Sequence, residues 1–153
     1  MSGTENTLVL DTTQGQVVIE MRPDLAPGHV ARIKELVGQG FYDGIVFHRV
    51  IDGFMAQTGC PQGTGTGGSG QKLKAEFNRE PHVRGTVSMA RANNPDSGDS
   101  QFFICFDDAR FLDGKYTVWG KVTSGMENVD KIKRGEPVSN PDKIIKAHMA
   151  AAA

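Results

Sequence analysis

The sequence has no long apolar run. Its longest uninterrupted apolar stretches, residues 102–106 and 149–153, span five residues each, whereas a helix that crosses a bilayer needs about 20. Apolar residues make up 38% of the 153-residue chain and charged residues 23%, a mixture too apolar for a disordered polymer. We therefore expect neither a membrane protein nor a disordered one, and the length predicts a single domain over residues 1–153.

An excess of one charge and a cysteine framework are also missing. Lys plus Arg total 17 against 18 Asp plus Glu, and no polybasic run could follow a phosphate backbone. Cys60 and Cys105 form neither a CxxC pair nor a cluster with zinc spacing. We therefore expect no nucleic-acid partner, no metal site and no disulfide, with both thiols reduced and structural. Residues 1–5 lack the pattern of a secretory signal, which predicts a cytoplasmic location.

Glycine, by contrast, is abundant. The chain has 19 glycines, nearly twice the usual share of about 7%, so many turns and short strands are expected. A two-residue hairpin loop is predicted at 14–15, and its apolar face would hold two cross-strand pairs, Leu8 with Met21 and Leu10 with Ile19. Further strands are predicted over residues 45–50, 54–57, 86–90, 101–106, 116–122 and 143–149.

Two helices are predicted among these strands. The first spans residues 25–38, where apolar residues recur at helical spacing before two glycines end the pattern. The second begins at Ser124, which forms a capping box with Glu127, and ends before Gly135. The elements together predict one β-rich domain, closed or nearly so, with two packed helices.

A glycine block at residues 63–70 matches the GxGxxG motif of nucleotide-binding loops. Such a loop leaves an apolar strand and opens a helix, but here Cys60-Pro61 precedes the block and an alternating stretch over 71–77 follows it. No Lys-Ser/Thr pair completes a P-loop either. The block is therefore interpreted as a surface loop.

Ser100 raises a serine hydrolase as an alternative, because it follows Gly98-Asp99 and His48 could act as its base. The bulky residues 101–103 come directly after it, so the small residues that an oxyanion hole needs are missing and the pattern is not GxSxG. The hydrolase is the minor alternative, and labelling of Ser100 by a serine-directed reagent would test it.

Residues 47–57, Phe-His-Arg-Val-Ile-Asp-Gly-Phe-Met-Ala-Gln, are more informative. A single exposed Arg or His on a strand is ordinary and covers apolar neighbours with its stem. Here one hairpin combines a guanidinium, two large apolar groups and an amide: Arg49, Phe54, Met55 and Gln57. A fixed donor beside an apolar floor is typical of a ligand cleft.

This stretch and several others resemble the cyclophilin family of peptidyl-prolyl isomerases. The others are Gly65–Gly68, Ser88–Ala92, Ser100–Cys105, Phe111–Lys115 and Val118–Lys121, which follow the family's order. The resemblance extends from about Leu8 to Met149 and implies a closed antiparallel barrel of about eight strands capped by two helices. Phe111 and Tyr116, where many eukaryotic members carry Trp and His, make the chain more similar to the small bacterial cytoplasmic forms.

The resemblance implies a role for individual residues in rotation about the peptide bond before proline. Arg49 would be the main electrostatic catalyst, with Phe54 and Gln57 beside it. Substrate-binding residues would be Met55, Ala90, Arg91, Ala92, Gln101, Phe103, Phe111, Leu112 and Tyr116. Arg91 stands where many members carry Asn, so its main chain rather than its side chain is expected to bind the peptide. No bond is made or broken, so no cofactor and no metal are expected.

The implied partners are proline-containing peptides and unfolded proteins. Cyclosporin is expected to inhibit the protein, but to bind more weakly than it binds members with Trp at the position of Phe111. A monomer is expected. The alternative function is a proline-peptide-binding or chaperone module without relevant turnover. Catalysis is favoured over it by the presence of Arg49, Phe54, Met55, Gln57 and Phe103.

Overall fold

The computed structural model describes residues 6–65, 67–135 and 138–150. Residues 1–5, whose sequence predicts no export signal, lie outside these ranges, as do Thr66 of the glycine block and the end of the apolar run at 149–153. Within the described ranges, no helix is long and apolar enough to cross a membrane.

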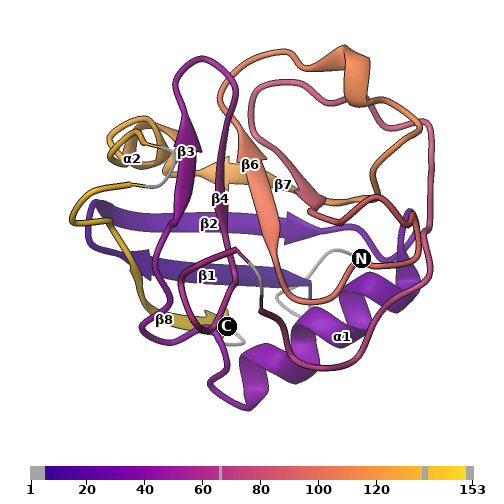
Figure 1. Cartoon of the computed structure of the whole chain (residues 1–153), viewed down its shortest axis with the longest axis horizontal. Helices are drawn as coiled ribbons and strands as arrows, with labels where there is room; N and C mark the ends of the chain where they lie inside the picture. Colours follow the sequence, from indigo (N-terminus) through magenta and orange to yellow (C-terminus); the bar gives the residue numbers. More distant parts are fainter. Residues whose placement is uncertain (1–5, 66, 136–137, 151–153) are drawn as a thin grey trace.

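In the described part of the chain, eight antiparallel strands form one sheet in the order β3-β4-β6-β5-β7-β2-β1-β8 (Figure 1). They are β1 (Thr7–Thr12), β2 (Gly15–Met21), β3 (Arg49–Ile51), β4 (Met55–Thr58), β5 (Thr86–Met89), β6 (Phe102–Cys105), β7 (Val118–Ser124) and β8 (Ile144–Met149). Each overlaps a strand predicted from the sequence, which confirms the number of strands and the mainly β class. The prediction over 45–50 is the least accurate, because β3 begins only at Arg49.

The sheet curls into an open half-barrel, so the predicted closed barrel is wrong. Its edge strands in the described part of the chain, β3 and β8, are not neighbours in the strand order. Instead of a continuous pairing of strands, isolated antiparallel bridges join Val46 to Lys143 and Val50 to Gly135. The N–H of Val50 donates to the carbonyl of Gly135 at 2.8 Å. A loop segment therefore occupies the outer edge of the short strand β3, where a closing strand would have to pair.

The hairpin of β1 and β2 is present, but its register differs from the predicted one by two residues. The observed pairs are Leu8 with Ile19, Leu10 with Val17 and Thr12 with Gly15. Thr12 explains the shift, because its hydroxyl donates to the carbonyl of Gly15 at 2.6 Å and accepts from the N–H of Gln14 at 3.1 Å. A shift of two residues keeps every side chain on its face, so the predicted apolar face is correct.

Helix α1 (Pro27–Gly38) confirms the first predicted helix and buries its apolar stripe. The backbone N–H groups at its N-terminus donate hydrogen bonds to a side chain from a distant part of the chain. The carboxylate of Glu76 accepts hydrogen bonds from the N–H groups of Gly28 at 3.1 Å and His29 at 2.8 Å. A carboxylate at this end of a helix is stabilised by the helix dipole. In Figure 1, α1 lies beside β8.

Helix α2 (Met126–Val129) is shorter than predicted, and the capping box at Ser124 is wrong. Ser124 is the last residue of β7 and pairs with Val18 of β2. The N-cap is Gly125, whose φ of +86° lies in the left-handed region and which makes no side-chain cap. A Cβ atom at Gly125 would collide with the carbonyl oxygen of Gln16. The close approach of α2 to β2 therefore requires glycine at this position.

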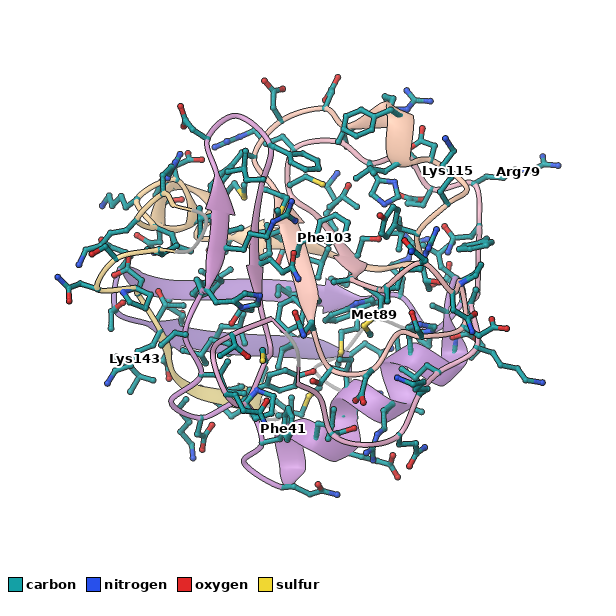
Figure 2. The ribbon with its side chains drawn as sticks, viewed as in Figure 1. Phe41, Arg79, Met89, Phe103, Lys115 and Lys143 are labelled. Atoms are coloured by element: carbon teal, nitrogen blue, oxygen red, sulfur yellow. The ribbon has the colours of Figure 1, made fainter. Side chains whose placement is uncertain are left out.

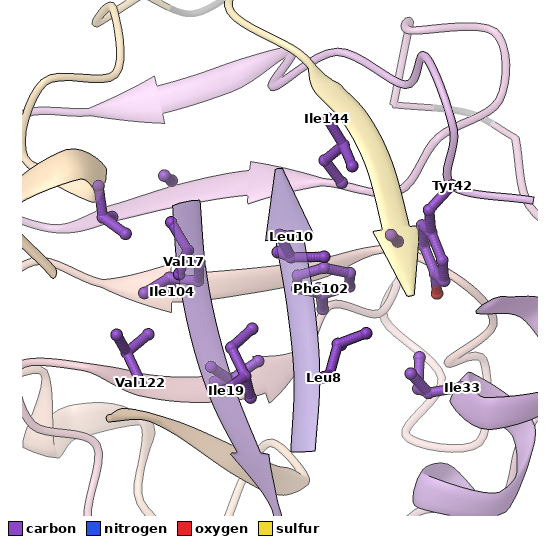
Figure 3. Packing of buried hydrophobic residues seen from close by; sticks show 14 of the residues in the cluster. Leu8, Leu10, Val17, Ile19, Ile33, Tyr42, Phe102, Ile104, Val122 and Ile144 are labelled. Atoms are coloured by element: carbon purple, nitrogen blue, oxygen red, sulfur yellow. The ribbon is translucent and has the colours of Figure 1, made fainter. Parts of the chain in front are cut away.

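The apolar side chains form two clusters, represented in Figure 2 by Met89 and Phe103. The larger is the core, in which residues of β1 and β2 meet Ile33 of α1 and Phe102 of β6 (Figure 3). Phe103, next in sequence, points to the opposite face because side chains alternate along a strand. There it joins the smaller cluster of Met55, Phe103, Cys105, Ala109 and Leu112, with Phe54, Ala90 and Tyr116 packed against it. This smaller cluster is the base of the candidate site.

Candidate active site

A cleft of about 590 Å³ opens over the smaller cluster. Predicted site residues that line it are Arg49, Phe54, Met55, Gln57, Ala90, Arg91, Phe103, Phe111, Leu112 and Tyr116, and His48, Thr64 and Gly65 line it as well. Ala92 and Gln101 do not; they line an adjoining cavity of about 240 Å³. An apolar cleft with a few convergent polar groups is the usual form of a small ligand site.

Three neighbouring strands bring the central residues together. Arg49 on β3 pairs with Gln57 on β4, and Gln57 pairs in turn with Phe103 on β6. Residues directly opposite in an antiparallel sheet have side chains on the same face within contact distance. The hairpin of residues 49–57 and the neighbouring strand β6 therefore place a cation, an amide and an aromatic ring in one row across the sheet.

A chain of side-chain amides holds the polar side of the cleft. Arg49 Nη1 donates to Gln57 Oε1 at 3.2 Å, and Gln57 Nε2 donates to Gln101 Oε1 at 2.9 Å. Gln101 Nε2 then donates to the carbonyl oxygens of Gly65 at 3.0 Å and Gly67 at 2.9 Å. Gln101 thus lies in the adjoining cavity and orients Gln57. Gln57 in turn orients the guanidinium of Arg49.

The apolar side of the cleft has a buried floor and an exposed rim. Met55, Phe103 and Leu112 are buried in the floor. Phe111, in the 3-10 helix η1 (Arg110–Leu112), is 66% exposed at the rim, and its ring lies 5.6 Å from that of Phe54. This arrangement offers a flat apolar ligand a fixed floor and an accessible edge.

Ser100 lies elsewhere and has no catalytic geometry. It is fully buried, and its hydroxyl donates to the carbonyl of Gly59 at 2.7 Å. A hydroxyl that is enclosed and committed to a backbone carbonyl is not available to attack a substrate. The serine-hydrolase alternative is therefore set aside.

The sequence and the fold match those of a known protein family. A family model described as cyclophilin-type peptidyl-prolyl cis-trans isomerase/CLD matches residues 7–149. The chain belongs to the cyclophilin family. It is therefore a peptidyl-prolyl cis-trans isomerase, as the resemblance of its segments implies.

Curated relatives of this cyclophilin carry the same activity in their names. A probable peptidyl-prolyl cis-trans isomerase of Brucella suis is 57% identical over 164 aligned positions, which cover 96% of this chain and 84% of the relative. The peptidyl-prolyl cis-trans isomerase B of Bacillus subtilis is 48% identical over 123 positions, covering 79% and 85%. The predicted likeness to small bacterial isomerases is consistent with these relatives.

Solved cyclophilins have the same fold. AquaCyp293 from Hirschia baltica superposes with a TM-score of 0.89 at 34% identity and covers 95% of this chain and 74% of its own. A Cryptosporidium parvum cyclophilin, solved in the presence of the dipeptide Ala-Pro, superposes with a TM-score of 0.88 at 27% identity, covering 95% and 99%.

The sequence did not point to His82, which lies beneath the floor of this cyclophilin's cleft. Its ring is fully buried and stacks on Phe103 with centroids 6.1 Å apart. Nδ1 lies 3.1 Å from Asp113 Oδ1 and Nε2 lies 2.9 Å from Ser88 Oγ. Burial lowers the pKa of His82, although the Asp113 carboxylate opposes this. These contacts hold the His82 ring in place against the underside of Phe103.

His48 lines the cleft beside Arg49, and its surroundings disfavour the charged form of its ring. Its side chain is buried, and neither ring nitrogen has a hydrogen-bond partner among the described residues. Burial, and then the charge of Arg49, lowers the pKa of His48 below its ordinary value of 6.5. The neutral imidazole therefore predominates at pH 7.

Cys60 organises the glycine block that forms one wall of the cleft. Its buried sulfur accepts hydrogen bonds from the N–H groups of Gly65 and Gly67, each at 3.3 Å. Burial opposes ionisation of the thiol, but the backbone hydrogen bonds outweigh burial and lower the pKa of Cys60 to about 7. Cys105 behaves in the opposite way, because burial raises its pKa to about 12. Both are free thiols, but only Cys105 is the inert structural thiol that the sequence suggests.

This lowered pKa predicts that Cys60 stabilises the fold more at alkaline pH. A thiol whose pKa is lower in the folded state contributes its full stabilisation at pH values above the unfolded-state pKa of about 9. This stabilisation is lost as the pH falls through the folded-state pKa of about 7. Relative to Cys60→Ser, the unfolding free energy of the wild type should rise by roughly 2 kcal/mol between pH 7 and pH 9. Urea denaturation of both proteins in reducing buffer measures this, and Cys105 is common to both. A difference that does not change with pH would contradict the assignment.

Proposed function

We propose that the enzyme rotates X-Pro bonds by holding the proline ring on the apolar floor of the cleft while Arg49 acts on the prolyl amide. The proposal rests on the position of the Arg49 side chain. The Arg49 guanidinium donates to Gln57 Oε1, and Gln57 pairs directly with Phe103 of the floor. A charged donor held beside an apolar surface matches what a twisting amide needs.

The chemistry requires no covalent step. Resonance gives the peptide bond a barrier of about 18–20 kcal/mol, and uncatalysed exchange before proline takes tens to hundreds of seconds. As the bond twists, the lone pair localises on the prolyl nitrogen. An Arg49 N–H would donate to that nitrogen or steady the moving carbonyl oxygen. Arginine suits this role because it stays charged at physiological pH and offers a rigid fork of donors.

Arg49 alone does not supply the whole acceleration. A rate enhancement of about 10⁶ requires roughly 8 kcal/mol, whereas removing one preorganised donor costs about 2.7–4 kcal/mol. The remainder would come from binding the twisted amide more tightly than the planar one in a cleft with little water. Phe54 closes over that amide, and Gln57 hydrogen-bonds the substrate backbone.

The rest of the substrate would lie along the adjoining cavity. The proline ring would contact Met55, Phe103 and Leu112, with Phe111 and Tyr116 at the rim. The main chain at Ala90 and Arg91 would bind the peptide backbone. The residue before the proline would then face Ala92 and the glycine block, in the cavity that Gln101 also lines.

The proposed partners follow from this geometry. Proline-containing peptides and unfolded proteins are the substrates, and the Cryptosporidium relative solved in the presence of Ala-Pro supports that class. Cyclosporin is the proposed inhibitor. The enzyme is proposed to act as a monomer, without nucleic acid or membrane as a partner. A cytoplasmic location stays a prediction from the sequence.

An NMR exchange assay on a short X-Pro peptide tests this function. Turnover is expected, and it should be unchanged by EDTA and nearly flat from about pH 6 to 9, because arginine does not titrate there. The lowered pKa of His48 keeps that group neutral over most of the same range. Binding of the peptide without faster exchange would show a proline-binding module instead. A rate that titrates with a midpoint below 6.5 would assign the chemistry to His48.

A further inference from the structure

The outer edge of strand β3 is covered by the segment that follows helix α2 (Figure 1). This strand has only three residues and begins at Arg49. Val50 and Gly135 exchange two backbone hydrogen bonds, each of 2.8 Å. The N–H of Val138 donates to the carbonyl of His48 at 3.2 Å. The residues directly before and after Arg49 are therefore both held by this segment.

The Arg134 side chain fixes the position of that segment. Its Nη1 donates to the carbonyl oxygens of Asp130 and Ile132, each at 2.6 Å. The guanidinium carbon lies 4.2 Å from the centre of the Phe106 ring, and a guanidinium is attracted to the face of an aromatic ring. Phe106 is buried and comes directly after β6. The segment is therefore packed against a fixed part of the sheet.

The same guanidinium also contacts the turn that joins β3 to β4. Arg134 Nε donates to Asp52 Oδ1 in this turn at 3.1 Å. Phe54, two residues further along, lines the cleft, and its carbonyl accepts from the N–H of Phe106 at 2.8 Å. Arg134 thus joins the turn of the hairpin to the segment that covers the edge of β3.

This ion pair is too exposed to contribute much to the stability of the fold. The Asp52 side chain is 83% exposed and that of Arg134 33%, and water and salt screen such pairs. Its geometric effect is larger, because one side chain fixes two parts of the backbone that flank Arg49. In a catalyst that works by placing a donor, a misplacement of about 1 Å can lower the rate by about 10²-fold.

We propose that Arg134 is a positioning residue that holds β3 through Asp52 and thereby sets the place of the Arg49 guanidinium. The proposal rests on the proposed function, in which Arg49 acts on the prolyl amide. Within the described ranges Arg134 does not line the cleft, so it affects the rate without touching the substrate.

The variants Arg134→Ala and Asp52→Ala test the proposal by NMR exchange on one X-Pro peptide at several concentrations. Arg134→Ala should lower kcat by roughly five- to twentyfold and Asp52→Ala by at least about threefold. The peptide Kd should stay within about twofold, because the apolar floor is unchanged. Asp52→Asn should keep more than about half of the wild-type kcat, since its amide oxygen still accepts from Arg134. Lys131→Ala, an exposed residue of the same segment, is the control and should match the wild type.

A double-mutant cycle separates positioning from a general loss of structure. In the Arg49→Ala background, Arg134→Ala should change kcat by less than about twofold, because no guanidinium is left to position. Wild-type kcat in both alanine variants, or an equal loss with and without Arg49, would overturn the proposal. Failure of the proposed function would be visible separately, because Arg49→Ala alone would then keep the wild-type rate.

Discussion

The variant Arg49→Ala should lower kcat/KM on a short X-Pro peptide by about 10²- to 10³-fold, the loss expected for one preorganised charged donor. The loss should be specific to the reaction, because the side chain points into the cleft and its hydrogen bond to Gln57 lies at the surface of the sheet. The fold should persist, because Arg49 is outside both apolar clusters.

Two further substitutions make this prediction sharper. Arg49→Lys should recover little activity, since a compact ammonium lacks the fork of the guanidinium. Arg79→Ala is the matched control, because Arg79 is exposed and projects outward in Figure 2; it should keep the wild-type rate. If Arg49→Ala retains more than about half of the wild-type kcat/KM, another group provides the catalysis.

The second large effect concerns Phe111 and cyclosporin. Phe111 is two-thirds exposed at the rim, and the centre of its ring lies 5.6 Å from that of Phe54. Trp at this position would offer a larger face and an N–H that donates to a carbonyl of the ligand. One hydrogen bond is worth about 0.5–1.5 kcal/mol and the added area about 1 kcal/mol. Cyclosporin should therefore bind this protein about one to two orders of magnitude more weakly than it binds Trp-bearing relatives.

The substitution Phe111→Trp should tighten cyclosporin at least several-fold and leave kcat/KM within about threefold. A short peptide depends mainly on the buried floor, whereas a large cyclic ligand also covers the rim. Inhibition titrations and tryptophan fluorescence measure the affinity of both proteins. An unchanged affinity, or a collapse of the isomerase rate, would show that Phe111 does not act as the rim of the ligand site.

The polar side of the cleft could be predicted from the sequence because Arg49 and Gln57 lie in one short segment whose pairing is local. Arg49 and Gln57 belong to one hairpin, so strand alternation alone places them side by side. The strands themselves were recognisable by apolar runs between glycine-bearing turns. The face of each strand was also predictable, since a two-residue slip in the first hairpin leaves the alternation intact.

Other features depend on contacts that no local pattern encodes. Closure of the sheet is prevented by the loop at Gly135, which is distant in sequence from β3. Ser124 has the sequence of a helix cap but is held in β7 by pairing with β2. His82 acquires its place under Phe103 only through packing. Cys60 differs from Cys105 because its neighbours supply backbone donors, which spacing does not reveal.

The central claim is that Arg49 stabilises the twisted amide rather than the bound substrate. The most direct test is NMR exchange on Arg49→Ala at saturating and subsaturating concentrations of one X-Pro peptide, which separates kcat from the dissociation constant. We expect kcat to fall by most of the predicted 10²- to 10³-fold while the peptide Kd stays within about threefold of the wild type. A variant that keeps the wild-type kcat and binds the peptide more weakly by the same factor would contradict it.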